Sequence, residues 1–297
     1  MRISFVTQAN DDLASYRYRI RIPSDHLSQH GHRPCISREL DKQADIAVFS
    51  KHFNPNDQKT LQDAKAKGIR TVFDICDYHF QGSLATHYIQ MAQLADLVTC
   101  STKELSKHIR KQTNREAIVI PDPYEMPLQR PRSTPGKPRL LWFGHSSNLH
   151  ALNKILPKIK DYPLTIVTNP VARLELPITP WSQKIMPQAF SSADLVIIPQ
   201  DNTIKTQCKS ANRLIESIRQ GVFVIASPLP AYKEFKDWCY LGDIVEGIHW
   251  AINHADEIPS RISAAQSYTR QHYSPQRIGD LWEQTLLGLL MKHPLYA

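Results

Sequence analysis

Short apolar runs alternate with longer, mixed stretches along the whole chain. In the first half the apolar runs cover residues 3–7, 46–50, 71–75, 97–100 and 117–120. Most of the stretches between them have the mixed polar and apolar character of amphipathic helices. Strands that alternate with helices in this way predict an α/β domain on a parallel sheet.

The same alternation returns in the second half. Apolar runs at 140–143, 164–167, 195–198 and 222–226 predict strands, and residues 149–159 predict a helix between the first two. A further amphipathic helix is expected over about 278–291. The predicted fold class is therefore α/β, with two Rossmann-like domains facing across a cleft.

A proline-rich stretch separates the two halves. Six prolines fall between Pro121 and Pro138, and proline at this density is incompatible with helix interiors and with the hydrogen-bond ladder of a sheet. We expect an extended, semi-rigid linker. The predicted division is a domain over 1–122, a linker over 123–138, a second domain over 139–272 and a terminal helix over 273–297.

Composition narrows the class of protein. The 297 residues leave room for two domains with ample cores, and no apolar run approaches the length of a membrane span. The amino terminus begins directly as a strand, without a signal-peptide pattern. Five scattered cysteines with no Cys-x-x-Cys spacing predict free thiols. Together these features predict a cytoplasmic protein.

The net charge of +8 favours an anionic partner. Nucleic acid, an anionic membrane surface and acidic ligands all satisfy that condition. No nucleic-acid motif or basic tract with interleaved aromatic residues occurs, which argues against a nucleic-acid partner. Peripheral contact with the inner face of an anionic membrane remains an alternative.

The segment from 191 to 235 carries the clearest chemical signal. A strand over 195–198 is followed by a polar loop, a helix that begins at Ser210 and ends near Gly221, and the strand over 222–226. Strand, helix and strand in this order predict parallel strands joined by a right-handed crossover. Ligands of such sheets bind outside the carboxyl ends of the strands.

Five side chains of this segment suit a nucleotide-diphosphate ligand. Lys205, Lys209, Asn212 and Arg213 gather near the predicted helix N-terminus, where basic groups and backbone N–H groups can hold phosphates. Glu216, one turn further, can bind ribose hydroxyls, so Glu216→Ala is expected to weaken nucleotide binding and to leave the fold intact. The alternative is an ordinary solvated helix face with an ion pair between residues three apart.

The same segment resembles a known family. The runs Ala193-Asp-Leu-Val-Ile-Ile-Pro199, Asn212-Arg-Leu-Ile-Glu216 and Gly221-Val-Phe-Val-Ile-Ala-Ser227 resemble the donor region of GT-B fold glycosyltransferases, particularly the group 1, family 4-type class. That resemblance implies transfer of a sugar from a nucleotide-diphosphate sugar, which is a substrate, to an acceptor hydroxyl, without a cofactor or a bound metal. The acceptor would be a glycan, a lipid-linked molecule or a small molecule.

The resemblance also assigns roles. It implies that Glu216 binds the ribose and that the preceding basic residues meet the diphosphate. The family carries two glutamates with seven residues between them, and Cys208 stands where the first would be. It further implies that the second domain binds the donor, that the first binds the acceptor, and that the terminal helix crosses back to brace the first domain.

Other resemblances extend along the chain. The run Ala14-Ser-Tyr-Arg-Tyr-Arg19 is similar to the opening helix of these enzymes, the run from Ala95 to Leu105 to their late first-domain strand and helix, and Leu140-Leu-Trp-Phe-Gly144 to the start of the donor domain.

The turn after the strand at 140–143 is a second candidate for donor contact. Gly144 lets the backbone approach a phosphate closely, and His145 and Asn148 would be polar liners of the site. The alternative is a simple turn glycine. The Gly-x-Gly-x-x-Gly pattern of dinucleotide-binding folds is absent.

Candidate catalytic groups follow a first-domain strand. Asp77 and His79 come after the strand at 71–75, where a carboxylate and an imidazole could polarise an acceptor hydroxyl. Arg17 and His52 are expected on the acceptor side, and no spacing matches a strong metal-ligand motif. The alternative is a capping aspartate and a surface histidine.

Two other functions compete with sugar transfer. One is a non-catalytic nucleotide-binding or scaffold protein of the same fold, since a fold does not guarantee an activity. The other is a nucleotide-sugar epimerase, which the pattern of Asn212, Arg213 and Glu216 fits less well.

Overall fold

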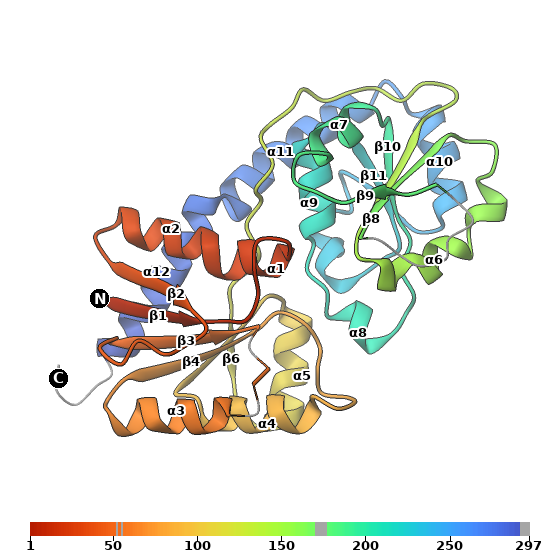
Figure 1. Ribbon diagram of the computed structural model, residues 1–297. Coiled ribbons are helices and arrows are strands. Elements are labelled where there is room, and N and C mark those ends of the chain that lie inside the picture. Colours follow the sequence, from red (N-terminus) through yellow and green to blue (C-terminus); the bar gives the residue numbers. More distant parts are fainter. Residues whose placement is uncertain (52, 55, 170–176, 292–297) are drawn as a thin grey trace. The chain divides into compact units, whose positions relative to one another are not determined.

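The computed structural model describes residues 1–51, 53–54, 56–169 and 177–291. They form two compact units, of which the first contains residues 1–123, 207–210 and the chain from 272 onward. The second contains residues 124–206 and 211–271. Each unit is a parallel sheet with helices on both faces (Figure 1).

The first unit contains a six-stranded sheet in the order β2-β1-β3-β4-β5-β6, with every neighbouring pair parallel. In chain order its elements are β1 (Arg2–Val6), α1 (Ala14–Tyr16), the π-helical η1 (Arg17–Arg21), α2 (Ile22–Gln29), β2 (Arg33–Ser37), β3 (Ile46–Ser50), α3 (Asp57–Ala66), β4 (Arg70–Ile75), α4 (Ala85–Leu94), β5 (Leu97–Cys100), α5 (Lys103–Thr113), β6 (Ala117–Val119) and α12 (Pro275–Met291).

The second unit contains a six-stranded sheet in the order β12-β11-β10-β7-β8-β9, also parallel throughout. Its elements are β7 (Leu140–Phe143), η2 (Ser146–Asn148), α6 (Leu149–Asn153), η3 (Leu156–Lys158), β8 (Leu164–Thr168), β9 (Thr179–Pro180), α7 (Met186–Ser191), β10 (Leu195–Ile198), α8 (Ile204–Gln207), α9 (Asn212–Arg219), β11 (Phe223–Ala226), η4 (Pro230–Phe235), β12 (Tyr240–Leu241), α10 (Ile244–Asn253) and α11 (Ile258–Tyr273). The last residues of α8 and α11 fall within the first unit.

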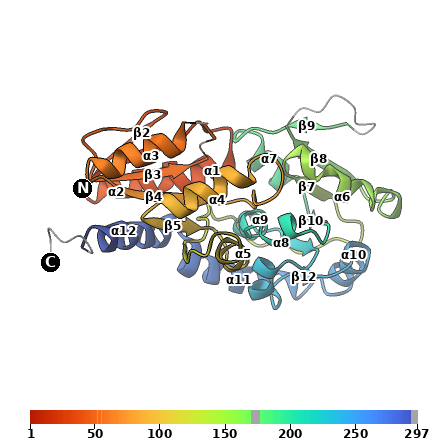
Figure 2. The ribbon, with the colours of Figure 1, turned by 90° about the horizontal axis from the view of Figure 1, so that it is seen from below.

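Alternating side chains of the central strands build two cores in the first unit. Ile46 and Val48 of β3 lie in a cluster with residues of α2 and α12, whereas Ala47 and Phe49 lie in a cluster with residues of α3, α4 and α5. This is the period-two pattern of a strand buried on both faces. The helix α12 therefore packs beside α2 on one face of the sheet (Figures 1 and 2).

The proline-rich stretch has no regular secondary structure and belongs to the second unit from Tyr124 onward. The backbone N–H of Gln129 donates to the Arg219 carbonyl at 2.8 Å, and that of Arg132 donates to the Gly221 carbonyl at 3.0 Å. The stretch is thus hydrogen-bonded to the end of α9 and to the turn that follows it.

The structure differs from the sequence predictions in several elements. The edge strand β2 was not expected, because its side chains are half-buried or exposed and its sequence lacks an apolar run. The helix predicted over 149–159 divides into α6 and η3. The short helix α8 lies in the loop that was predicted to be irregular.

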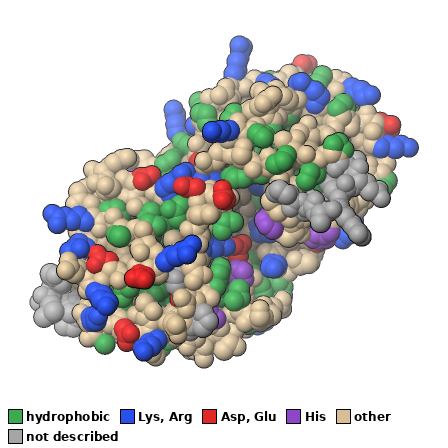
Figure 3. All heavy atoms as spheres, in the orientation of Figure 1, with side chains coloured by type: hydrophobic (Ala, Val, Ile, Leu, Met, Phe, Trp, Pro, Cys, Tyr) green, Lys and Arg blue, Asp and Glu red, His purple; other side chains and the backbone are tan. Residues whose placement is uncertain are grey.

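Charge is spread over the surface that Figure 3 shows. Lysine and arginine side chains, in blue, protrude singly from the visible face of each unit, with acidic side chains among them. Among the described residues, no helix combines the length and apolar content needed to cross a bilayer.

Candidate functional site

Lys51 and Asp77 meet at the carboxyl ends of β3 and β4 in the first unit. The Lys51 ammonium forms an ion pair with Asp77 Oδ2. The backbone of Lys51 has a φ of 51°, in the left-handed region that few residues other than glycine adopt. Such strain is maintained only where the surroundings impose it, and it often marks functional sites.

This pair determines the ionisation of both groups. Burial opposes the charge of the Lys51 ammonium, but Cys76 and Asp77 beside it raise the pKa of Lys51. Burial would likewise raise the pKa of Asp77, yet the Lys51 ammonium outweighs it and lowers that pKa. At neutral pH the Asp77 carboxylate is therefore ionised, and the charge of Lys51 balances its own. It is suited to accepting hydrogen bonds from hydroxyls, but it is a weak base.

The predicted partner of Asp77, His79, packs among aromatic rings. Its imidazole centroid lies 5.7 Å from the Phe53 ring and 4.6 Å from the Tyr88 ring. The charge of His79 also contributes to the low pKa of Asp77, after the larger effect of Lys51. The two predicted catalytic residues are therefore near each other, but the direct partner of Asp77 is Lys51.

Arg17 and His52 are the two residues of the first unit that were predicted on the acceptor side. Arg17 is buried in the π-helical turn η1, where its Nη1 donates to the Asp11 carbonyl at 2.6 Å. Single π-helical turns occur frequently at functional sites. His52, the other predicted residue, lies outside the described residues.

A buried ionic network supports this edge of the sheet. Arg19 donates to the two carboxylate oxygens of Asp74 at 2.6 and 3.1 Å, and it lies 3.3 Å from Asp122 Oδ1. The hydroxyls of Ser50 and Thr99 donate to the same Asp74 carboxylate. Sequence analysis did not assign this network, although a carboxylate inside an apolar strand, as at Asp74, implies a buried partner.

Lys209 belongs to the first unit, although it was predicted to bind the donor together with residues of the second. Its charge lowers the pKa of Asp77, behind the larger effect of Lys51. Lys205 is exposed on α8 and belongs to the second unit. The two lysines of the predicted cluster are thus divided between the units.

In the second unit Arg213 reaches the turn after β7. Its Nη1 donates to the Phe143 carbonyl at 3.2 Å, and a Cβ atom at Gly144 would lie only 3.1 Å from that nitrogen. Glycine thus allows this close approach. The structure brings Gly144 and Arg213 together, and their contact with a donor stays a prediction.

Arg213 is a half-buried cation with neutral neighbours. Burial lowers the pKa of Arg213, and the Tyr232 hydroxyl beside it acts in the opposite direction. Arginine keeps its charge in proteins nevertheless. Among the described residues no carboxylate forms an ion pair with Arg213. A half-buried cation that lacks a counter-ion is suited to bind an anionic ligand.

The N-terminus of α9 adds backbone donors next to Arg213. Ala211 is its N-cap residue and supplies no side-chain hydrogen bond to the first turn, which begins with Asn212 and Arg213. The first N–H groups of a helix have no partner within the helix, and they attract anions. Arg213 and these N–H groups together provide the elements of a phosphate site.

The loop after Gly144 is fixed by its own polar groups. His145 Nδ1 accepts from the Ser147 N–H at 3.2 Å, and Asn148 Nδ2 donates to the His145 carbonyl at 3.2 Å. Asn169, which follows β8, accepts from the Ser146 N–H at 2.8 Å. The two predicted liners therefore shape the turn, and Asn169 is a supporting residue that sequence analysis missed.

Glu216 is 4 % exposed and already holds two backbone groups. Its Oε1 accepts from the Glu125 N–H at 2.7 Å, and its Oε2 accepts from the Met126 N–H at 3.0 Å. Glu216 thus fastens the proline-rich stretch to α9.

Comparison with solved structures gives matches over nearly the whole chain. A crystal structure of Anabaena Alr3699/HepE in complex with UDP and glucose has a TM-score of 0.72 and 14% identity, covering 97% of this chain and 99% of that one. An alpha-glucosyltransferase in complex with UDP-glucose and DNA containing an abasic site has a TM-score of 0.65 and 10% identity, covering 98% and 100%. An alpha1,3-fucosyltransferase has a TM-score of 0.55 and 10% identity, covering 100% and 91%.

No protein-family model and no curated protein sequence matches the chain. The likeness is therefore one of structure. Together with the two parallel six-stranded sheets, it confirms the predicted GT-B fold class.

Proposed function

We propose that the protein is a glycosyltransferase that moves a sugar from a nucleotide-diphosphate sugar to an acceptor hydroxyl. The observation that carries this proposal is Arg213, a half-buried cation with no described counter-ion, beside Gly144 and the uncapped start of α9. A diphosphate would supply the missing negative charge. UDP-glucose is our first candidate donor, because similar structures of this fold contain UDP and glucose or UDP-glucose.

In this proposal the second unit stabilises the leaving group. Negative charge grows on the nucleotide diphosphate as the sugar departs, and fixed donors directed at that charge lower the barrier. Arg213 and the first N–H groups of α9 would act in this way, with Lys205 and Lys209 as further cations. Asn212, His145 and Asn148 would line the donor site, and Glu216 would bind the ribose. The reaction would then need no metal ion.

The first unit would receive the acceptor. The ionised Asp77 would accept a hydrogen bond from the acceptor hydroxyl and orient it, with His79, Arg17 and His52 as neighbouring contacts. The acceptor would be a glycan, a lipid-linked molecule or a small molecule. A lipid-linked acceptor would fit the net charge of +8 through contact with an anionic membrane at its cytoplasmic face.

Turnover of UDP-glucose in the presence of a chelator tests the proposal. The protein should release UDP slowly by hydrolysis and faster when a suitable acceptor is added, and the chelator should not reduce the rate. Binding of UDP without release from UDP-glucose, with or without acceptors, would favour a non-catalytic nucleotide-binding protein. Interconversion of the sugar without an acceptor would favour an epimerase.

A further inference from the structure

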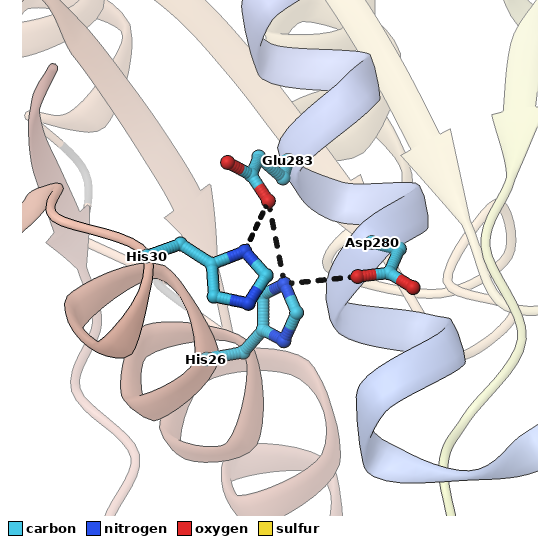
Figure 4. Close-up of side chains that lie close together, drawn as sticks. All are labelled: His26, His30, Asp280 and Glu283. Atoms are coloured by element: carbon cyan, nitrogen blue, oxygen red, sulfur yellow. Dashed lines mark hydrogen bonds and ion pairs between the residues drawn. The ribbon is translucent and has the colours of Figure 1, made fainter.

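Two helices of the first unit bring four potential metal ligands together. His26 lies on α2 and His30, four residues later, is its C-cap, while Asp280 and Glu283 lie three residues apart on α12 (Figure 4). Residues at these spacings share one face of a helix. One ligand atom from each side chain can be chosen so that all four lie within 4.8 Å of one another.

The separations suit a tetrahedral ion. His26 Nε2 lies 3.4 Å from Asp280 Oδ1 and 3.4 Å from Glu283 Oε2. Zinc bonds of about 2.0–2.1 Å in a tetrahedron place neighbouring ligand atoms about 3.3 Å apart. His30 Nδ1 and Glu283 Oε2 are 2.7 Å apart, so they would need to separate slightly.

The buried imidazole of His26 points into this group of ligands. Its side chain is 5 % exposed, and Nε2 makes no hydrogen bond to any residue that the structure describes. A Cβ atom at Gly279 would overlap the His26 ring, so glycine on α12 makes room for the imidazole between the helices. A buried nitrogen that faces two carboxylates without a hydrogen bond is suited to bind a cation.

Glu283 is oriented by a third histidine. His32 Nε2 donates to Glu283 Oε1 at 2.9 Å, which leaves Oε2 directed toward His26 and His30. Metal-binding side chains are commonly fixed by such outer hydrogen bonds.

We propose that His26, His30, Asp280 and Glu283 bind one divalent transition-metal ion, with zinc as the best candidate. Two imidazoles and two carboxylates suit zinc and its neighbours in the transition series better than magnesium or calcium, which prefer oxygen ligands alone. His30 and Asp280 are about one-third exposed, which gives the ion a route from solvent. The proposal departs from the sequence-based expectation of no metal site.

The position of this site implies a structural role. His32 directly precedes β2, so these ligands lie near the amino ends of the strands. Lys51 and Asp77 follow β3 and β4, at the carboxyl ends. The ion would therefore join α12 to α2 away from the candidate catalytic residues, and the proposal stands independently of sugar transfer.

Calorimetric titration of the untagged, chelator-treated full chain with zinc tests the site. We expect one ion per chain, with affinity reduced at least about 100-fold in His30→Ala and in Asp280→Asn, since even the loss of outer hydrogen bonds costs about 10- to 100-fold. His150→Ala is the matched control, because His150 pairs with one carboxylate, that of Asp201. Zinc should also raise the melting temperature of the unmodified chain.

Two results would overturn the proposal. One is the absence of zinc binding by the unmodified chain, and the other is equal affinity in His30→Ala, Asp280→Asn and the control. Circular dichroism would establish that each variant is folded. If a variant does not fold, the visible spectrum of the unmodified chain with cobalt decides, because four-coordinate cobalt absorbs far more strongly than the hydrated ion. A spectrum of hydrated cobalt alone would then contradict the site.

Discussion

Two arginines of this protein, the buried Arg19 and the half-buried Arg213, have opposite surroundings. Arg19 in the first unit is paired with Asp74 and lies within 3.3 Å of Asp122. Arg213 in the second unit has a backbone carbonyl and the Tyr232 hydroxyl as neighbours. A buried cation whose counter-ions are in the chain stabilises the fold, whereas one that lacks them is available to a ligand. The comparison separates a structural arginine from a candidate binding residue.

The largest effect is expected from breaking the structural pair. Arg19→Met would leave Asp74 and Asp122 buried without their cation, which should lower the free energy of unfolding by about 3–5 kcal/mol. Urea denaturation of the variant and of the unmodified chain measures this difference. A loss below about 1 kcal/mol would show that Arg19 is not the structural partner of these carboxylates.

Glu216→Ala should have the next largest effect on stability. It would remove the carboxylate acceptor of the N–H groups of the half-buried Glu125 and Met126, at about 1 kcal/mol for each hydrogen bond lost. The sequence-based expectation is instead that the substitution leaves the fold intact, and the denaturation experiment decides between the two. The exposed Glu116→Ala is the control and should change stability by less than about 0.5 kcal/mol. Equal stability of the two variants would contradict the anchoring role of Glu216.

Gly144→Ala should have a moderate effect on ligand affinity. The added methyl group would lie 3.1 Å from Arg213 Nη1 and displace the guanidinium by a few tenths of an ångström. We expect UDP affinity to fall about tenfold, or roughly 1.4 kcal/mol. Gly136→Ala is the control, because no atom lies within 4 Å of its added Cβ. An equal effect of both substitutions in a calorimetric titration would argue against contact between Gly144 and the phosphate-binding group.

Arg213→Met should change stability least. Replacing a half-buried, unpaired cation by an apolar side chain of similar length is expected to change the free energy of unfolding by less than about 1 kcal/mol. The same denaturation experiment as for Arg19→Met measures it. A loss as large as that of Arg19→Met would show that Arg213 is also structural and would remove the contrast between the two residues.

The sequence predicted the central strands well, because they are continuous apolar runs buried on both faces. β3, β5, β7 and β10 match the expected ranges. The edge strand β2 has no such run and was missed. Buried strands can therefore be predicted from the local sequence. An edge strand such as β2 forms by pairing with a neighbouring strand, and the local sequence does not reveal that pairing.

The site was predicted less completely, because its partners are distant in the sequence. Glu216 was expected to bind a ligand, and its described partners are backbone groups about 90 positions away. Asp77 was paired with the nearby His79, but its ion pair is with Lys51. Residue types and strand ends indicated where the chemistry lies, while the pairing of charges depends on the three-dimensional fold.

Parallel titrations with UDP and with uridine test the central claim most directly. If Arg213 is the counter-ion of a diphosphate, Arg213→Met should weaken UDP binding by about 1.5–3 kcal/mol, or roughly 10- to 150-fold. Its affinity for uridine, which carries no phosphate, should stay the same. Equal losses for both ligands, or unchanged UDP affinity, would contradict the assignment of Arg213 to the diphosphate.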